Sequence, residues 1–171
     1  MVLAGVGIFL SILGIYMVRT KEGASMKQLM GALMKGVVGS SVLIIVAALG
    51  VCWLLLGGID GVNWFGVWLA ICVGMAAGLL IGWATEYYTS YDYKPTKEVA
   101  ENAETGSATV IISGIATGLK STWFSLLVVI AAIIAAYSFA GGSDSMLLGL
   151  YGVGIAAVSM LATLGITLAT D

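Results

Sequence analysis

The sequence lacks histidine altogether and contains one proline and two cysteines among its 171 residues. The absence of histidine excludes imidazole metal ligands and imidazole general bases from this chain. A single proline leaves long helices with few breaks. Cys52 and Cys72 both lie in apolar runs and form no C-x-x-C motif or other ligand-like spacing. The cysteines therefore indicate neither a zinc site nor a disulfide framework.

Charged residues are also scarce. They make up 9% of the chain, whereas hydrophobic residues make up 60%, and the mean hydropathy is +1.08. Soluble domains carry about 25% charged residues because their surfaces face water. A chain of this composition is therefore expected to lie in a lipid bilayer. The net charge of −2, with seven basic residues, also argues against a nucleic-acid partner.

Five stretches are long enough, or nearly so, to cross a hydrocarbon core of about 30 Å, which requires about 20 apolar residues. They comprise residues 1–18, 36–56, 62–84, 109–140 and 146–169. Barrel strands are about 10 residues long and alternate polar with apolar residues, so these stretches predict helices. We expect an all-α integral membrane protein, a bundle of about five transmembrane helices in a single region. Because an apolar run begins at Met1 and Asp171 directly follows another, we expect a fragment of a longer chain and a larger bundle.

The basic residues predict the orientation of this bundle. Six of the seven fall in two connections between predicted spans: Arg19, Lys21, Lys27, Lys35, Lys94 and Lys97. The connections at residues 57–61 and 141–145 carry only acidic charges. Cytoplasmic loops hold the excess of lysine and arginine in membrane proteins. We therefore expect a multi-pass protein of the cell membrane with its N-terminus outside and Asp171 at the cytoplasmic face.

Glycines recur at four-residue spacing in two of the predicted helices. Gly74, Gly78 and Gly82 form one ladder, and Gly114 and Gly118 form another. Such ladders let membrane helices approach each other closely. They predict helix packing and say little about chemistry.

Glu86 is a candidate functional residue at the end of the third predicted span. Aromatic residues surround it in the sequence: Trp83, Tyr87, Tyr88, Tyr91 and Tyr93. One interpretation is an interfacial aromatic belt with a solvated carboxylate. The other is an ionisable group at the mouth of an ion path. The pattern alone favours the belt.

A short helix is predicted to begin at Pro95. Glu98, Glu101 and Glu104 follow at three-residue spacing, so they share about one face of that helix. Three carboxylates on one face can bind a divalent cation, but such a face is more often simply solvated.

Lys120 lies about three turns into the fourth predicted helix. A lysine in hydrocarbon is costly unless it is paired or reaches the interface. The stretch 109–140 is longer than a bilayer requires, so the simpler interpretation is that the helix protrudes and Lys120 sits near the interface.

Three sequence motifs resemble those of one family. They are T-E-Y-Y-T-S at residues 85–90, followed by Pro95; T-G-S-A-T-V-I-I-S-G from Thr105; and the terminal run G-L-Y-G-V-G-I-A-A-V-S-M-L-A-T-L-G-I-T-L-A-T-D. Together they resemble the ion-translocating membrane-bound inorganic pyrophosphatases, in colinear order over essentially the whole chain. A secondary transporter or channel bundle without hydrolytic activity remains the alternative.

The resemblance implies that hydrolysis of inorganic pyrophosphate drives Na⁺ or H⁺ across the membrane, with Mg²⁺ as cofactor, K⁺ as an activator in some members and a homodimeric assembly. It implies that Asp171 matches the first aspartate of a longer metal-binding motif, so Asp171 is the candidate ligand for Mg²⁺ and substrate. Glu86 is expected to serve coupling or the interface. The catalytic set is incomplete within this chain, so we expect the isolated chain to be inactive.

Overall fold

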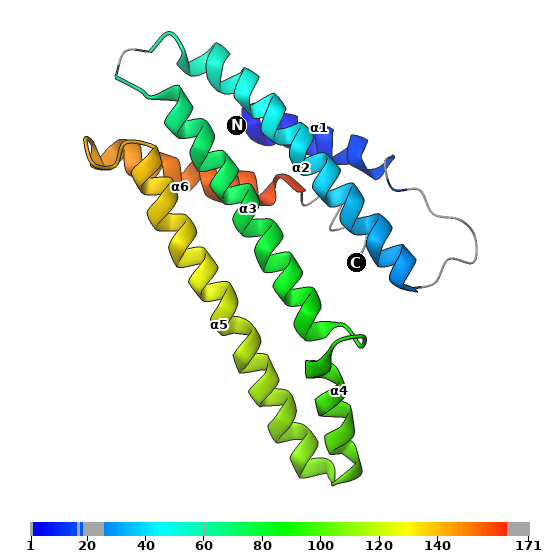
Figure 1. Cartoon of the computed structure of the whole chain (residues 1–171). Helices are drawn as coiled ribbons and strands as arrows, with labels where there is room; N and C mark the ends of the chain where they lie inside the picture. The colour runs from blue at the N-terminus through cyan, green and yellow to red at the C-terminus, as the bar shows by residue number, and fades with distance from the viewer. Residues whose placement is uncertain (1, 17, 19–25, 60, 164–171) are drawn as a thin grey trace. The chain divides into compact units, whose positions relative to one another are not determined.

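A computed structural model of the chain describes residues 2–16, 18, 26–59 and 61–163 (Figure 1). Every regular element in this part of the chain is helical, which confirms the all-α prediction. In chain order the elements are α1 (Val2–Ile15), α2 (Met26–Leu56), α3 (Trp64–Thr89), α4 (Lys94–Glu101), the 3₁₀ turn η1 (Asn102–Glu104), α5 (Ser107–Phe139), α6 (Met146–Met160) and the 3₁₀ turn η2 (Leu161–Thr163). Asp171 lies outside the described residues.

Among the described residues, three helical segments are long and apolar enough to cross a membrane; they begin at Gly31, Trp64 and Ser107. Helices α1 and α6 are apolar but shorter, with 14 and 15 residues. Helix α5, with 33 residues, extends over about 50 Å at 1.5 Å per residue, which exceeds the hydrocarbon core of about 30 Å. The fold is therefore that of an integral membrane protein.

Two helices extend beyond the predicted spans. Helix α2 begins at Met26 rather than at residue 36, because the added stretch is rich in Met, Lys, Gln, Leu and Ala, which favour helix. Lys27 and Lys35 therefore lie on α2, not in a connection. Helix α3 continues to Thr89, where the hydroxyls of Thr85 and Thr89 donate to carbonyls one turn earlier, each at 2.8 Å.

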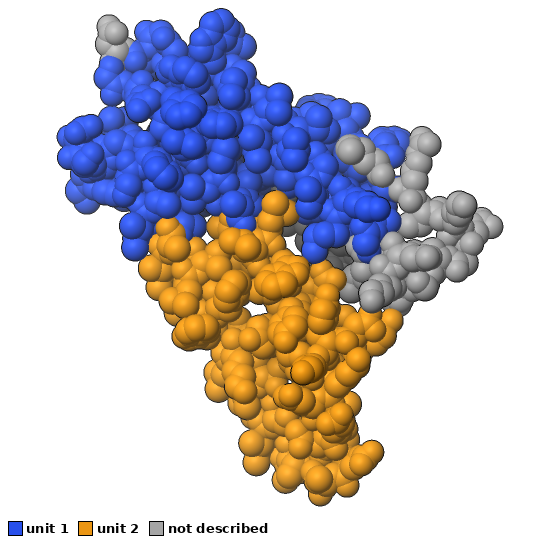
Figure 2. Space-filling view, viewed as in Figure 1, with its two compact units in different colours: residues 1–76, 132–171 blue, residues 77–131 orange. Residues whose placement is uncertain are grey.

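The chain divides into two compact units (Figure 2). Unit 1 comprises residues 1–76 and 132–171, and unit 2 comprises residues 77–131. The core of unit 1 is formed by seven buried residues: Ile44, Ala48, Cys52, Val67, Ile71, Met75 and Ala162. They bring together α2, α3 and η2, so the predicted spans pack as a bundle rather than as separate helices.

Polar contacts fix how the helices of unit 1 begin and cross. Asn63, just before α3, accepts a hydrogen bond from the Gly66 amide at 3.2 Å and so caps the helix. The indole N–H of Trp68 donates to the Ile45 carbonyl of α2 at 3.1 Å. A side-chain bond to a carbonyl of another helix aligns α3 with α2, since both partners lie in an apolar environment.

Candidate functional site

Four of the aromatic residues around Glu86 form a cluster within unit 2. Tyr87 lies at its centre: its ring centroid is 6.4 Å from that of Trp83, 5.3 Å from that of Tyr88 and 5.1 Å from that of Tyr93. These distances are typical of favourable aromatic pairs. Because Trp83, Tyr87 and Tyr88 lie on α3 and Tyr93 follows it, the cluster holds the chain after α3 against the end of that helix.

A hydrogen bond closes the same corner. Thr96, in the first turn of α4, donates its hydroxyl proton to the Tyr88 carbonyl at 3.3 Å. Pro95 lies at the start of α4, as predicted, where its missing N–H costs nothing. Glu86 is half-buried beside this corner. The geometry is that of an ordered aromatic corner beside one carboxylate, and the role of Glu86 stays a prediction.

The three glutamates after Pro95 do not form a metal site. Glu98 and Glu101 lie on α4 and Glu104 lies in η1, all three with exposed side chains. Among the described residues no group of three acidic, cysteine or histidine side chains is placed to hold a metal ion. The solvated face is therefore the better interpretation of these glutamates.

A polar turn that the sequence did not reveal connects α4 with α5. The side-chain amide of Asn102 donates to the Glu98 carbonyl at 2.8 Å and to the Ser113 hydroxyl at 3.0 Å. The Asn102 carbonyl in turn accepts from the hydroxyls of Thr105 at 2.8 Å and Thr109 at 3.0 Å. This turn bends the chain back on itself, so that α5 starts beside α4.

Lys120 lies on α5 with an exposed side chain. The helix begins at Ser107, so Lys120 is less than four turns from its start. The length of α5 agrees with a helix that protrudes from the bilayer, and the interfacial position of Lys120 stays a prediction.

The end of α6 and the turn η2 are held inside unit 1. Ser159 of α6 is fully buried, and its hydroxyl lies 3.1 Å from the Ile71 carbonyl of α3. Ala162 of η2 is also buried and packs on α1, where a Cβ added at Gly7 would lie 3.0 Å from the Ala162 Cβ. The last described turns before Asp171 are therefore in contact with two other helices.

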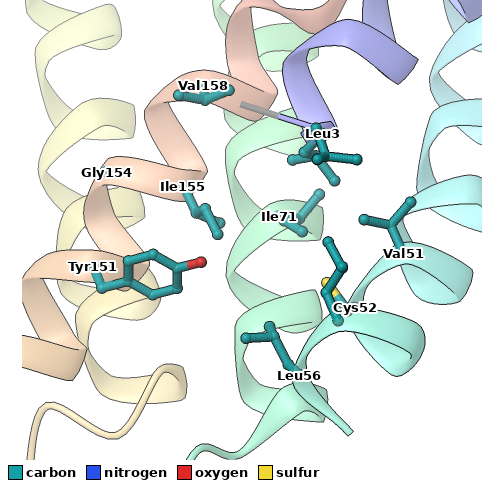
Figure 3. Close-up of a pocket in the computed structure, with 11 residues that line it drawn as sticks. Leu3, Val51, Cys52, Leu56, Ile71, Tyr151, Gly154, Ile155 and Val158 are labelled. Atoms are coloured by element: carbon teal, nitrogen blue, oxygen red, sulfur yellow. The ribbon is translucent and has the colours of Figure 1, made fainter. Parts of the chain in front are cut away.

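Unit 1 also contains an apolar cavity of about 530 Å³ (Figure 3). Its lining includes Leu3, Cys52, Leu56, Ile71 and Tyr151. Tyr151 carries the only hydroxyl among the side chains labelled in Figure 3. Such a lining cannot compensate the charge of an anion such as a phosphate, since buried charge requires paired or hydrogen-bonded partners. The residues of this chain that line the cavity therefore supply no charged group for such a substrate.

These features define a multi-pass helical membrane protein. The chain belongs to the inorganic H⁺ pyrophosphatase family, whose family model matches residues 1–171. The family resemblance predicted from the sequence motifs is thereby confirmed.

Relatives that match the chain are pyrophosphate-energized pumps by name. A protein of Bacteroides thetaiotaomicron, provisionally named a K⁺-stimulated pyrophosphate-energized sodium pump, is 51% identical over 173 residues, which cover 100% of this chain and 23% of that protein. A K⁺-insensitive pyrophosphate-energized proton pump of Methanosarcina mazei is 40% identical over 172 residues, or 100% of this chain and 24% of the pump. A K⁺-stimulated pyrophosphate-energized sodium pump of Thermotoga maritima is 38% identical over 104 residues, or 61% of this chain and 13% of the pump. The chain thus spans about a quarter of the length of the first two relatives.

Proposed function

We propose that this chain is part of a membrane-bound inorganic pyrophosphatase that couples pyrophosphate hydrolysis to the transport of Na⁺ or H⁺. The observation that carries the proposal is the match of the whole chain to pumps of both kinds. Hydrolysis of so dense an anion relies on metal ions that neutralise charge and activate a water molecule. Mg²⁺ prefers oxygen ligands, which makes it the cofactor expected for a carboxylate site.

Asp171 is the residue of this chain that we assign to the metal and substrate. The role rests on the resemblance of the terminal run to the family and on the position of Asp171 after an apolar segment. A carboxylate at the end of a membrane helix can reach Mg²⁺ and pyrophosphate without crossing hydrocarbon. Glu86 belongs to the aromatic corner of unit 2 instead, so we assign it to the interface or to coupling.

Pyrophosphate-driven transport tests the function directly. In sealed vesicles containing a full-length pump that carries this segment, we expect addition of Mg²⁺ and pyrophosphate to drive uptake of either ²²Na⁺ or protons. Repeating the assay with and without K⁺ assigns the pump to the K⁺-stimulated or K⁺-insensitive kind. Hydrolysis that proceeds without uptake of either ion would contradict the coupling, and ion movement without hydrolysis would favour a channel or secondary transporter.

We further propose the orientation predicted from the charges, with α4 on the cytoplasmic side. The exposed lysines include Lys35 on α2 and Lys94 and Lys97 on α4. Exposed lysines near the ends of membrane helices are expected on the cytoplasmic side. In intact cells, with both native cysteines replaced, Glu101→Cys on α4 should resist an impermeant thiol reagent. Asp144→Cys, in the turn between α5 and α6, should react; both native side chains are exposed. Labelling of Glu101→Cys without labelling of Asp144→Cys would contradict this orientation and indicate the opposite one.

The lipid bilayer and a second copy of the protein are the partners proposed for α5. Its side chains include exposed large apolar residues, with Ile112 at 69% and Leu119 at 68%. Apolar surface exposed on this scale requires contact with lipid or protein, because its removal from water lowers the free energy by a large amount. A second copy, lipid and the rest of the longer protein would together cover this helix.

A further inference from the structure

The apolar cavity of unit 1 extends from the packed core to the surface of the unit (Figure 3). Its lining includes Ile71, which is fully buried, and Cys52, which is 3% exposed. It also includes Val2 and Leu55, whose side chains are 56% and 55% exposed. An apolar cavity stays free of water, and the interiors of proteins are close-packed. The cavity is therefore suited to an apolar occupant that enters from the membrane.

Tyr151 of α6 supplies the polar group of this cavity. Of the described residues that line the cavity, Tyr151 alone carries a hydroxyl, and its ring extends from α6 into the space (Figure 3). No described residue forms a hydrogen bond with this hydroxyl. The lining also includes Leu56, the last residue of α2, so the cavity reaches the level at which that helix ends. Tyrosine is enriched at this level of a bilayer, where hydrocarbon meets the polar headgroups.

The size of the cavity favours a flexible chain over a helix. A membrane helix is about 10 Å across, so a volume of about 530 Å³ holds little more than one of its turns. A methylene group occupies roughly the volume of a water molecule, about 30 Å³, so the same cavity has room for roughly ten or more carbons in a chain. The cavity therefore fits an acyl chain better than a helix from another part of the longer protein.

The glycines of α6 distinguish its packed face from the face toward the cavity. A Cβ added at Gly152 would collide with Ala140 and with the Ala136 carbonyl. Gly154 also lies on α6 and lines the cavity, but nothing in the described part of the chain lies within 4 Å of a Cβ added there. A side chain at position 154 would therefore occupy space that is open in this structure.

We propose that this cavity binds one acyl chain of a bilayer phospholipid, and that the Tyr151 hydroxyl donates a hydrogen bond to an ester carbonyl oxygen of the same lipid. The acyl chain lies along α6 from Tyr151 to Val158, which are about 10 Å apart at 1.5 Å per residue. Leaving bulk hydrocarbon for a dry cavity costs the acyl chain no desolvation, and the ester supplies the acceptor that Tyr151 lacks within the described residues. This inference requires only the membrane setting and does not depend on pyrophosphate hydrolysis.

Photo-crosslinking tests the inference in a full-length pump that carries this segment. The pump is reconstituted in phospholipid vesicles that contain a trace of phosphatidylethanolamine with a diazirine in the middle of one acyl chain. After irradiation, mass spectrometry of the digested protein should find adducts on Cys52 and Ile71, which bulk lipid does not reach because both are buried. Adducts elsewhere on the pump with none on these two residues would overturn the inference, and would indicate that another part of the longer protein fills the cavity.

Gly154→Leu should exclude the acyl chain by filling its space. Labelling of Cys52 and Ile71, relative to adducts elsewhere on the pump, should fall about fivefold or more, which corresponds to the lower end of the cost of overfilling a packed site. Gly82→Leu is the matched control, because a Cβ added at Gly82 also meets no described residue within 4 Å and Gly82 does not line the cavity. This control should label like the unmodified pump, and equal losses in both variants would contradict the proposed site.

Tyr151→Phe tests the hydrogen bond with little change in the shape of the cavity. Labelling of Cys52 and Ile71 should fall about fivefold, the factor that corresponds to a typical net hydrogen bond. Unchanged labelling would overturn the contact between Tyr151 and the lipid. A free fatty acid with the same diazirine serves as the second probe, and labelling by the fatty acid but not by the phospholipid would overturn the assignment to a phospholipid.

Discussion

Replacing Asp171 by asparagine in a full-length pump that carries this segment should raise the Mg²⁺ requirement of pyrophosphate hydrolysis by about 100-fold or more. Loss of a partner that merely orients a metal ligand already costs about 10–100-fold in affinity or activity, and Asp171 is proposed as a ligand itself. The neutral amide keeps the shape of the side chain but removes its negative charge, which Mg²⁺ prefers. Hydrolysis measured as phosphate release against Mg²⁺ concentration gives the result directly.

Glu86→Gln is the comparison for this variant, because it also replaces a carboxylate by an amide of the same shape. Glu86 lies beside the aromatic corner of unit 2, whose contacts are made by ring faces and by the Tyr88 carbonyl rather than by a carboxylate. Its Mg²⁺ profile should therefore match that of the unmodified pump, and any change should be confined to the number of ions moved per pyrophosphate. A normal Mg²⁺ profile for Asp171→Asn would show that Asp171 is not a metal ligand.

The membrane helices were predictable from hydropathy, and their ends less so. The predicted stretch 109–140 corresponds to α5 at Ser107–Phe139, because a long apolar run bounded by polar residues is typical of a single membrane helix. The start of α2 was missed by ten residues. Hydropathy detects the apolar part of a helix, whereas α2 also includes the polar and charged residues between Met26 and Lys35.

The candidate site was predictable only where its residues are close in the sequence. Trp83 and Tyr87 are four residues apart, so a helix alone brings their rings together, as the structure shows. The bond from Asn102 to Ser113 depends on the turn at Gly106, whose φ of +139° favours glycine. The contact of Ser159 with Ile71 depends on the packing of two helices distant in the sequence, and no local pattern marks it.

The glycine ladder on α3 also shows that a sequence pattern does not reveal which residues contact another helix. Substitution within this ladder is the second change for which we expect a large effect. Gly74→Ala should destabilise the 171-residue chain by about 1–3 kcal/mol, the usual cost of forcing an extra methyl group into a packed interior. The added methyl would meet the backbone of α6, which cannot rotate aside as a flexible side chain can. Unfolding of the chain from mixed micelles by SDS, followed by tryptophan fluorescence and circular dichroism, measures the loss.

Gly82→Ala is the control within the same ladder. Among the residues that the structure describes, nothing lies within 4 Å of a Cβ added at Gly82. Alanine favours helix over glycine by up to about 1 kcal/mol, so this variant should be neutral or slightly more stable. The sequence presents Gly74 and Gly82 as equivalent small residues two turns apart, but only Gly74 faces the backbone of another helix in the described structure. Equal losses of stability at the two positions would contradict the close contact of α3 with α6.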